Sequence, residues 1–114
     1  MFDDMQKSIL KANIAVLAGE CHRIATEHGF WESTNKGEKI ALMHSELSEC
    51  LEALRHGNPR DEHIPEFDNA TVELADCIIR ILDFARREGL RLPDAILAKM
   101  EYNEKRPRKH GKEF

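Results

Sequence analysis

Two pairs of acidic residues carry the strongest chemical signal in the chain. Glu46 and Glu49 are three residues apart, and Glu73 and Asp76 repeat this spacing after 23 intervening residues. Residues three apart on a helix share one face, so each segment presents two carboxylates together. Four converging carboxylates repel one another and need cations, and ligands that are all oxygen suit a hard divalent ion. The spacing therefore predicts a site for Mg²⁺, with Mn²⁺ also possible.

The same residues have a simpler interpretation as parts of solvated helix faces. Asp76 has Arg80 four residues further on, which is the spacing of a surface ion pair. Asp83 and Arg87 have the same spacing. A di-iron site is excluded, because such sites need Glu-x-x-His and no Glu in this chain is followed by His at that distance.

The elements that must position these acids are expected to be helices. Apolar residues recur at steps of three and four, Gly and Pro interrupt the pattern at intervals, and no segment alternates like a strand. Asn35 with Glu38 has the pattern of a capping box, and Pro93 with Asp94 fits a first helical turn. The pattern predicts four helices, at Phe2 to about His28, Asn35 to Gly57, Pro65 to Gly89, and Pro93 to about Arg106.

The second and third predicted helices should form an antiparallel hairpin, with the third at the centre of the fold because apolar residues cover more than half of its circumference. With a rise of about 1.5 Å per residue counted from the turn, Glu49 is level with Glu73, and Glu46 is level with Asp76. A helix that started nearer Asn69 would shift this match by about one turn. The acids therefore converge if the two faces meet.

Composition limits the class of protein. With 114 residues, 41% hydrophobic and 33% charged, the chain fits one domain over residues 1–114, an all-α bundle of four helices. Its net charge of −4 argues against a nucleic-acid polymer as partner. An acidic N-terminus and the lack of an apolar run of about 20 residues predict a cytoplasmic protein that does not enter the membrane. Three cysteines without zinc-ligand spacing are expected to be reduced and buried: Cys21, Cys50 and Cys77.

Residues outside the acid pairs suggest binding groups for an anion and a planar ring. Lys99, Asn103 and Arg106 share one face of the fourth helix, which suits a phosphate chain or forms a solvated basic end. Trp31 could stack on a nucleobase or simply fill the core, and His22 could line the same site or lie on the helix surface.

The acid pattern resembles that of the MazG-like, all-α nucleoside triphosphate pyrophosphohydrolases, whose signature is E-x-x-E, a variable spacer and E-x-x-D. The resemblance extends from about His22 to Phe114. Members often end in Lys-x-x-x-Asn-x-x-Arg-Pro and a Lys-His-Gly tail, and dCTP-type members have a His and a Trp nine residues apart in the base pocket. The residues here that match these features are Lys99, Asn103, Arg106, Pro107, Lys109, His110 and Gly111, together with His22 and Trp31.

The resemblance implies hydrolysis of a (deoxy)nucleoside triphosphate to the monophosphate and pyrophosphate, with Mg²⁺ as cofactor. It implies that Glu49 orients or deprotonates the attacking water. The implied binding residues are Glu46, Glu49, Glu73 and Asp76 for metal, Lys99, Asn103, Arg106 and Lys109 for phosphate, and Trp31 and His22 for the base.

Some residues depart from the dCTP-type pattern, since Arg80 replaces a Tyr and His56 replaces a Trp. The base preference is therefore left open. Relatives and the wide apolar face of the third helix indicate a homodimer or homotetramer. Two other functions are consistent with the sequence. The chain could be a non-catalytic, metal-stabilised helical oligomer that acts as an interaction or regulatory module, or a phosphoribosyl-ATP pyrophosphohydrolase, which accounts less naturally for the Lys-His-Gly ending.

Overall fold

Four α-helices and no β-strand make up the fold in the computed structural model, which describes all of residues 1–114. The all-α prediction is thus confirmed. No helix combines the length and the apolar character needed to cross a membrane. The helices are α1 (Asp4–Glu27), α2 (Lys36–Arg55), α3 (Asn69–Glu88) and α4 (Leu92–Glu104), and a short 3₁₀ turn follows at Arg108–Gly111.

Most helix ends lie where the sequence predicts them. The Asn35 side chain accepts a hydrogen bond from the backbone N–H of Glu38 and so caps α2. The capping box is only half formed, because the Glu38 carboxylate accepts from Ser33 Oγ instead of from the Asn35 backbone. Gly89 ends α3 in the left-handed conformation, with φ of +66°, which a residue without a side chain adopts at little cost.

The prediction that the third helix begins at Pro65 is wrong, because α3 begins at Asn69. Two aspartates explain the difference. The Asp61 carboxylate accepts from the backbone N–H groups of the second and third residues after it, and the Asp68 carboxylate accepts from the N–H of Thr71. Short acidic side chains that bond the backbone in this way favour turns and N-caps over helix interiors.

Asn58 fixes the hairpin loop at both ends. Its backbone N–H donates to the Ala53 carbonyl (2.7 Å), its side-chain oxygen accepts from the N–H of buried Ala70 (2.8 Å), and its φ is +47°. We expect Asn58→Ala to lower the free energy of unfolding by roughly 2 kcal/mol, because it leaves a buried donor unpaired and places a side chain less tolerant of this φ there. Urea unfolding measures the loss. Asn58→Asp keeps the acceptor and should retain most of the stability, so equal losses in the two variants would contradict this account.

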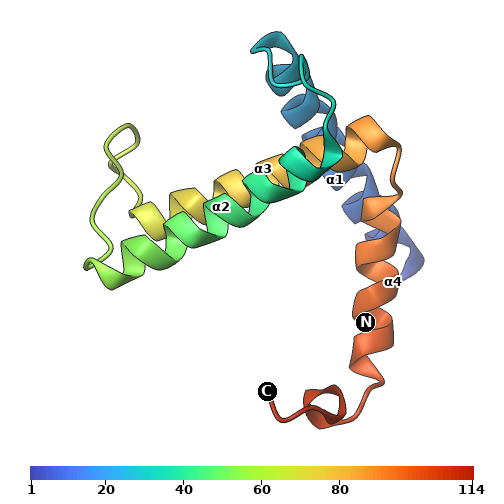
Figure 1. The fold of residues 1–114 in the computed structure, drawn as a ribbon. Coiled ribbons are helices and arrows are strands. Elements are labelled where there is room, and N and C mark those ends of the chain that lie inside the picture. The colour runs from blue at the N-terminus through green and yellow to red at the C-terminus, as the bar shows by residue number, and fades with distance from the viewer.

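The hairpin of α2 and α3 is the dominant feature of the molecule. The two helices run side by side along their length, α1 crosses α3 near the end of the hairpin opposite the loop, and α4 packs on α1 and leads away from the hairpin (Figure 1). Helix α3 contacts both α1 and α2, as expected of the central helix. The core at the crossing is small, and its buried residues are Ala18, Cys21 and Leu82. The half of the hairpin nearest the loop is free of α1 and α4 (Figure 1).

A six-residue pattern occurs once on each helix of the hairpin: Glu-Leu-Ser-Glu-Cys-Leu from Glu46 and Glu-Leu-Ala-Asp-Cys-Ile from Glu73. Cys50 and Cys77 are buried free thiols, as predicted, and the Cys77 thiol contacts the backbone carbonyl of Met43 on α2 (3.6 Å). In two antiparallel helices that each turn a cysteine inward, residues the same number of positions from that cysteine lie on the same side of the hairpin. An approximate two-fold axis therefore relates α2 to α3 and gives the hairpin two distinct sides.

We call these sides the acid flank and the apolar flank. The acid flank consists of Glu46, Glu49, Glu73 and Asp76, and the apolar flank of Leu47, Leu51, Leu54, Leu74, Ile78 and Ile81. All residues of the apolar flank are exposed, with accessible fractions between 36% and 57%. The radius of gyration of the molecule, 16.5 Å, exceeds the value of about 13 Å typical of a compact chain of this length.

Candidate metal and nucleotide site

Three of the four acids lie close enough to share a cation. One carboxylate oxygen from each of Glu46, Glu49 and Glu73 lies within 4.8 Å of the other two. Adjacent ligands of an octahedral Mg²⁺ are about 3.0 Å apart and opposite ligands about 4.2 Å, so the three side chains would close inward to bind one ion. Glu46 is buried, Glu73 is half-buried and Glu49 is exposed, so the cluster has one dry side and one side open to water.

Two oxygens of this cluster have no hydrogen-bond partner although they are buried: Glu46 Oε2 and Glu73 Oε2. Glu46 as a whole is only 6% exposed. A buried carboxylate oxygen without a donor or a cation is unfavourable, and most buried polar groups are paired. A hard dication would satisfy both atoms at once, so the donor set fits Mg²⁺ or Mn²⁺.

The pKa values of Glu46 and Glu73 are shifted in opposite directions. Burial, together with hydrogen bonding to Glu46 and Glu49 and the negative charge of these two residues, raises the pKa of Glu73 to about 8. Burial also acts to raise the pKa of Glu46, but hydrogen bonds from Glu73 and Arg80 outweigh it and hold that pKa below its usual value. Without a metal, the Glu73 carboxyl therefore holds its proton more tightly than an ordinary carboxyl.

Asp76 lies outside the three-oxygen cluster, on the side toward α1. Burial and the nearby Glu46 charge raise its pKa. It shares a pocket of about 330 Å³ with Glu46, whereas Glu49 and Glu73 line a second pocket of about 290 Å³ near the hairpin loop. Glu46 with Asp76, and Glu49 with Glu73, are also the two pairs that the sequence predicts to be level along the hairpin. The acid flank thus separates two cavities, which we call the aromatic pocket and the loop pocket.

The aromatic pocket takes its shape from the turn between α1 and α2. The Lys39 ammonium, although almost fully buried, donates to the Phe30 carbonyl and lies 4.7 Å from the Trp31 ring centroid. Trp31 Nε1 donates to Asp83 Oδ1 (2.8 Å). These contacts attach the turn to both α2 and α3, so Trp31 is buried and also forms part of the pocket wall.

His22 lies behind this wall. Its Nδ1 is 2.8 Å from Asp83 Oδ1, and its ring meets Trp31 edge-on with 6.0 Å between centroids. It does not line the aromatic pocket, so any effect of His22 on a ligand would pass through Asp83 and Trp31. Arg87 stacks on Trp31 at 4.8 Å and does not form an ion pair with Asp83.

Arg80 connects the aromatic pocket to the acid flank. Its Nε–H donates to Glu46 Oε1 (3.0 Å), and its guanidinium carbon lies 5.8 Å from the centre of the Phe30 ring. Arg80 therefore pairs with Glu46 on the neighbouring helix and not with Asp76, which lies one turn away on the same helix. Neither of the surface pairs at i, i+4 that the sequence allowed is formed.

The basic residues of α4 and of the segment that follows it lie apart from the acids (Figure 1); Arg106, expected on the face of the fourth helix, lies just beyond the end of α4. Lys99 and Arg106 flank the Tyr102 ring, at 4.7 and 5.4 Å, while the Lys109 ammonium donates to the Glu113 carbonyl and Asn103 Oδ1 is buried without a partner. Helix α3 extends 15 residues beyond Glu73 before it ends, which is about 22 Å, and α4 then leads away (Figure 1). Within one chain, the basic face of α4 does not reach the acid flank.

Three pocket residues were missed by reasoning from the sequence: Phe30, Lys39 and Asp83. The aromatic Phe30-Trp31 pair was the only local signal for them, because Lys39 and Asp83 look like ordinary surface charges on their helices. Comparisons with known protein families, curated proteins and solved structures found no match.

Proposed function

We propose that the protein is a Mg²⁺-dependent pyrophosphohydrolase of the MazG-like type, which hydrolyses a (deoxy)nucleoside triphosphate to the monophosphate and pyrophosphate. The observation that carries this proposal is the pair of unpaired buried oxygens of Glu46 and Glu73, in a carboxylate cluster that adjoins an aromatic pocket. The cavity of about 330 Å³ falls in the size range of small-molecule sites.

The two cavities suggest how a substrate lies. The nucleoside would occupy the aromatic pocket, with its base beside Phe30, and the triphosphate would pass over the acid flank toward the loop pocket. The loop pocket is lined mainly by polar residues, among them Glu49 and Glu73, so phosphate groups enter it only together with cations.

Glu46, Glu49, Glu73 and Asp76 would hold the metal. When bound, Mg²⁺ would neutralise charge on the phosphate oxygens and lower the pKa of a water. Glu49 is the exposed member of the cluster, so it would be the carboxylate that accepts a proton from the attacking water. Glu73 would lose its own proton when the site is loaded.

The test of the function is pyrophosphate release from a panel of canonical and damaged nucleoside triphosphates, with Mg²⁺ and with EDTA. Turnover that requires Mg²⁺ supports the proposal. Absence of turnover with every triphosphate at millimolar Mg²⁺ would contradict it.

Phosphate contacts by Lys99, Asn103, Arg106 and Lys109 would require a second copy of the chain, because α4 leads away from the acids of its own chain. The apolar flank offers the surface for that association. Exposed apolar patches of this kind mark interaction sites, and two hairpins packed flank to flank would form a four-helix arrangement. We propose a homodimer or homotetramer in which α4 of one chain approaches the acid flank of another.

This assembly predicts that Leu51→Glu produces monomers. Leu51 is central to the apolar flank, and a charge there would be buried without a partner in the assembly. Sedimentation velocity at micromolar concentration should show a multiple of 13.1 kDa for the natural chain and 13.1 kDa for the variant. Ser48→Glu adds the same charge at an exposed position outside the flank and should keep the assembly. A natural chain that sediments as a monomer would overturn the prediction.

The second candidate is a non-catalytic helical oligomer that retains the acids for metal-dependent stability. The exposed apolar flank favours it as much as it favours an oligomeric enzyme. Thermal shift with Mg²⁺ and a non-hydrolysable triphosphate separates the two, since only the enzyme should be stabilised further when the nucleotide is added to Mg²⁺.

A further inference from the structure

We propose that Arg80 determines which base the site accepts, and that it selects bases with two neighbouring hydrogen-bond acceptors on one edge, which are guanine and cytosine. This inference rests on the proposed function, because it assigns the substrate class of the same site.

The orientation of the Arg80 guanidinium is fixed by two contacts. Nε–H donates to Glu46 Oε1, and the guanidinium carbon lies 5.8 Å from the centre of the Phe30 ring. Glu46 is buried, so this anchor does not compete with bulk water. The side chain is therefore held between the acid flank and the aromatic wall of the pocket, with 29% of its surface accessible.

The remaining donors of Arg80 are uncommitted. A guanidinium carries five N–H groups, and only the Nε–H of Arg80 has a partner. The other cation in the pocket, Lys39, already donates to the Phe30 carbonyl and lies over Trp31. The two amino groups of Arg80 thus provide a planar pair of donors in the pocket that a base would occupy.

A planar pair of donors matches two acceptors that are adjacent on one base edge. Guanine offers O6 with N7, which is the commonest bidentate partner of Arg, and cytosine offers O2 with N3. Adenine has no two adjacent acceptors, because N1 and N7 neighbour the amino group and N3 stands alone. Thymine and uracil have none either, because an N–H group separates their two carbonyls. The geometry therefore favours guanine and cytosine over adenine and thymine.

The approximate two-fold symmetry of the hairpin shows that this feature belongs to one pocket only. The repeat that relates Glu46 to Glu73 relates Ala53 to Arg80, and Ala53 lines the loop pocket. The loop pocket has no cationic side chain at the equivalent position. Arg80 thus distinguishes the nucleoside end of the site from the end proposed for the phosphates.

Binding of free nucleosides to the full chain tests this inference without any catalysis. Quenching of Trp31, the sole tryptophan and part of the pocket wall, gives the Kd for deoxyguanosine, deoxycytidine, deoxyadenosine and thymidine. We expect Kd to be about tenfold lower for deoxyguanosine, deoxycytidine or both than for the other two nucleosides. Arg80→Lys keeps the charge beside Glu46 but lacks the planar pair of donors, so the four Kd values should converge.

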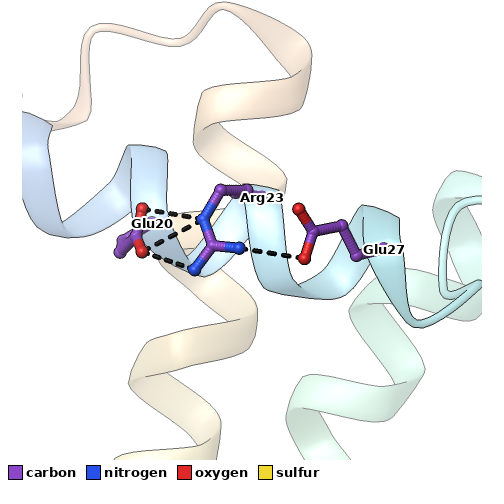
Figure 2. A network of polar contacts seen from close by, with 3 residues as sticks. All are labelled: Glu20, Arg23 and Glu27. Atoms are coloured by element: carbon purple, nitrogen blue, oxygen red, sulfur yellow. Dashed lines mark hydrogen bonds and ion pairs between the residues drawn. The ribbon is translucent and has the colours of Figure 1, made fainter.

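Arg23→Lys is the matched control. Arg23 also binds carboxylates through its guanidinium, those of Glu20 and Glu27 on the exposed face of α1 (Figure 2), but it lies outside both pockets. The control should keep the selectivity of the natural chain. Arg80→Met, checked by its thermal melting curve, provides a second variant and should also lose the selectivity.

Each outcome bears on a separate claim. Equal Kd values for the four nucleosides in the natural chain, a preference for adenine or thymine, or selectivity that survives in Arg80→Lys would overturn the role of Arg80. These results would leave the proposed function standing if triphosphates still release pyrophosphate. Selective nucleoside binding without pyrophosphate release would support the role of Arg80 and contradict the proposed enzyme.

Discussion

Glu73→Gln should reduce Mg²⁺-dependent pyrophosphate release by more than about 100-fold in kcat/KM, since loss of even an outer-shell partner of a metal site costs up to that factor. Glu73 contributes one oxygen to the three-carboxylate cluster and has a second, buried oxygen without a partner. Glutamine preserves the shape but offers a neutral amide in place of a carboxylate. A coupled assay for pyrophosphate measures the change.

The control is Glu66→Gln, which removes the same charge from an exposed loop position away from both pockets. It should leave activity within twofold, and the far-UV circular dichroism of both variants should match that of the natural chain. Activity in Glu73→Gln equal to that of the control would exclude the carboxylate cluster as the metal site.

The stability of the metal-free protein should fall as pH rises from about 5 to 9. The pKa of Glu73 is about 8 in the folded chain, well above its ordinary value of 4.5. Between these two values the folded state holds a proton that the unfolded state has lost, so the free energy of unfolding decreases as pH increases. Melting temperatures in EDTA at steps across this range measure the effect, and Mg²⁺ should restore stability most at the alkaline end because it replaces the lost proton.

The difference between the natural chain and Glu73→Gln isolates this effect from other titrating groups. The amide introduced by this substitution has no proton to lose, so the stability of the variant relative to that of the natural chain should rise between pH 4.5 and about 8 and level off above pH 8. A difference in melting temperature that stays constant with pH would show that Glu73 titrates normally in the folded protein.

The sequence was sufficient to predict what depends on local spacing. Helical periodicity gave four helices, Asn35 and Gly89 act as the expected cap and stop, and the acid spacing placed Glu46, Glu49 and Glu73 together. The predicted start of α3 was wrong because the side chains of Asp61 and Asp68 accept hydrogen bonds from nearby backbone N–H groups. Pro65 alone did not reveal that these bonds would replace the first helical turn.

The contacts that shape the aromatic pocket were beyond prediction from the sequence. Arg80 had Asp76 in reach on its own helix, but it pairs with Glu46 on the neighbouring one, and Asp83 pairs with Trp31 across 52 positions of sequence. For Arg80, a carboxylate on the same helix and one on the neighbouring helix carry the same charge, so only the packing of the helices decides which of them it pairs with. The repeated Glu-Leu-x-acid-Cys pattern was the one unused signal, since it implies that both helices present the same faces.

Glu49 and Glu73 line the loop pocket, to which α1 and α4 contribute no residue. Segments with few tertiary contacts open at lower free energy than the crossing of packed helices, so the first turns of α3 can separate from α2 while the α1–α3 crossing stays closed. Amide hydrogens on either side of Glu73 would then exchange with solvent faster than those near Leu82. Entry and release of a bound ion could use this partial opening, without disassembly of the rest of the molecule.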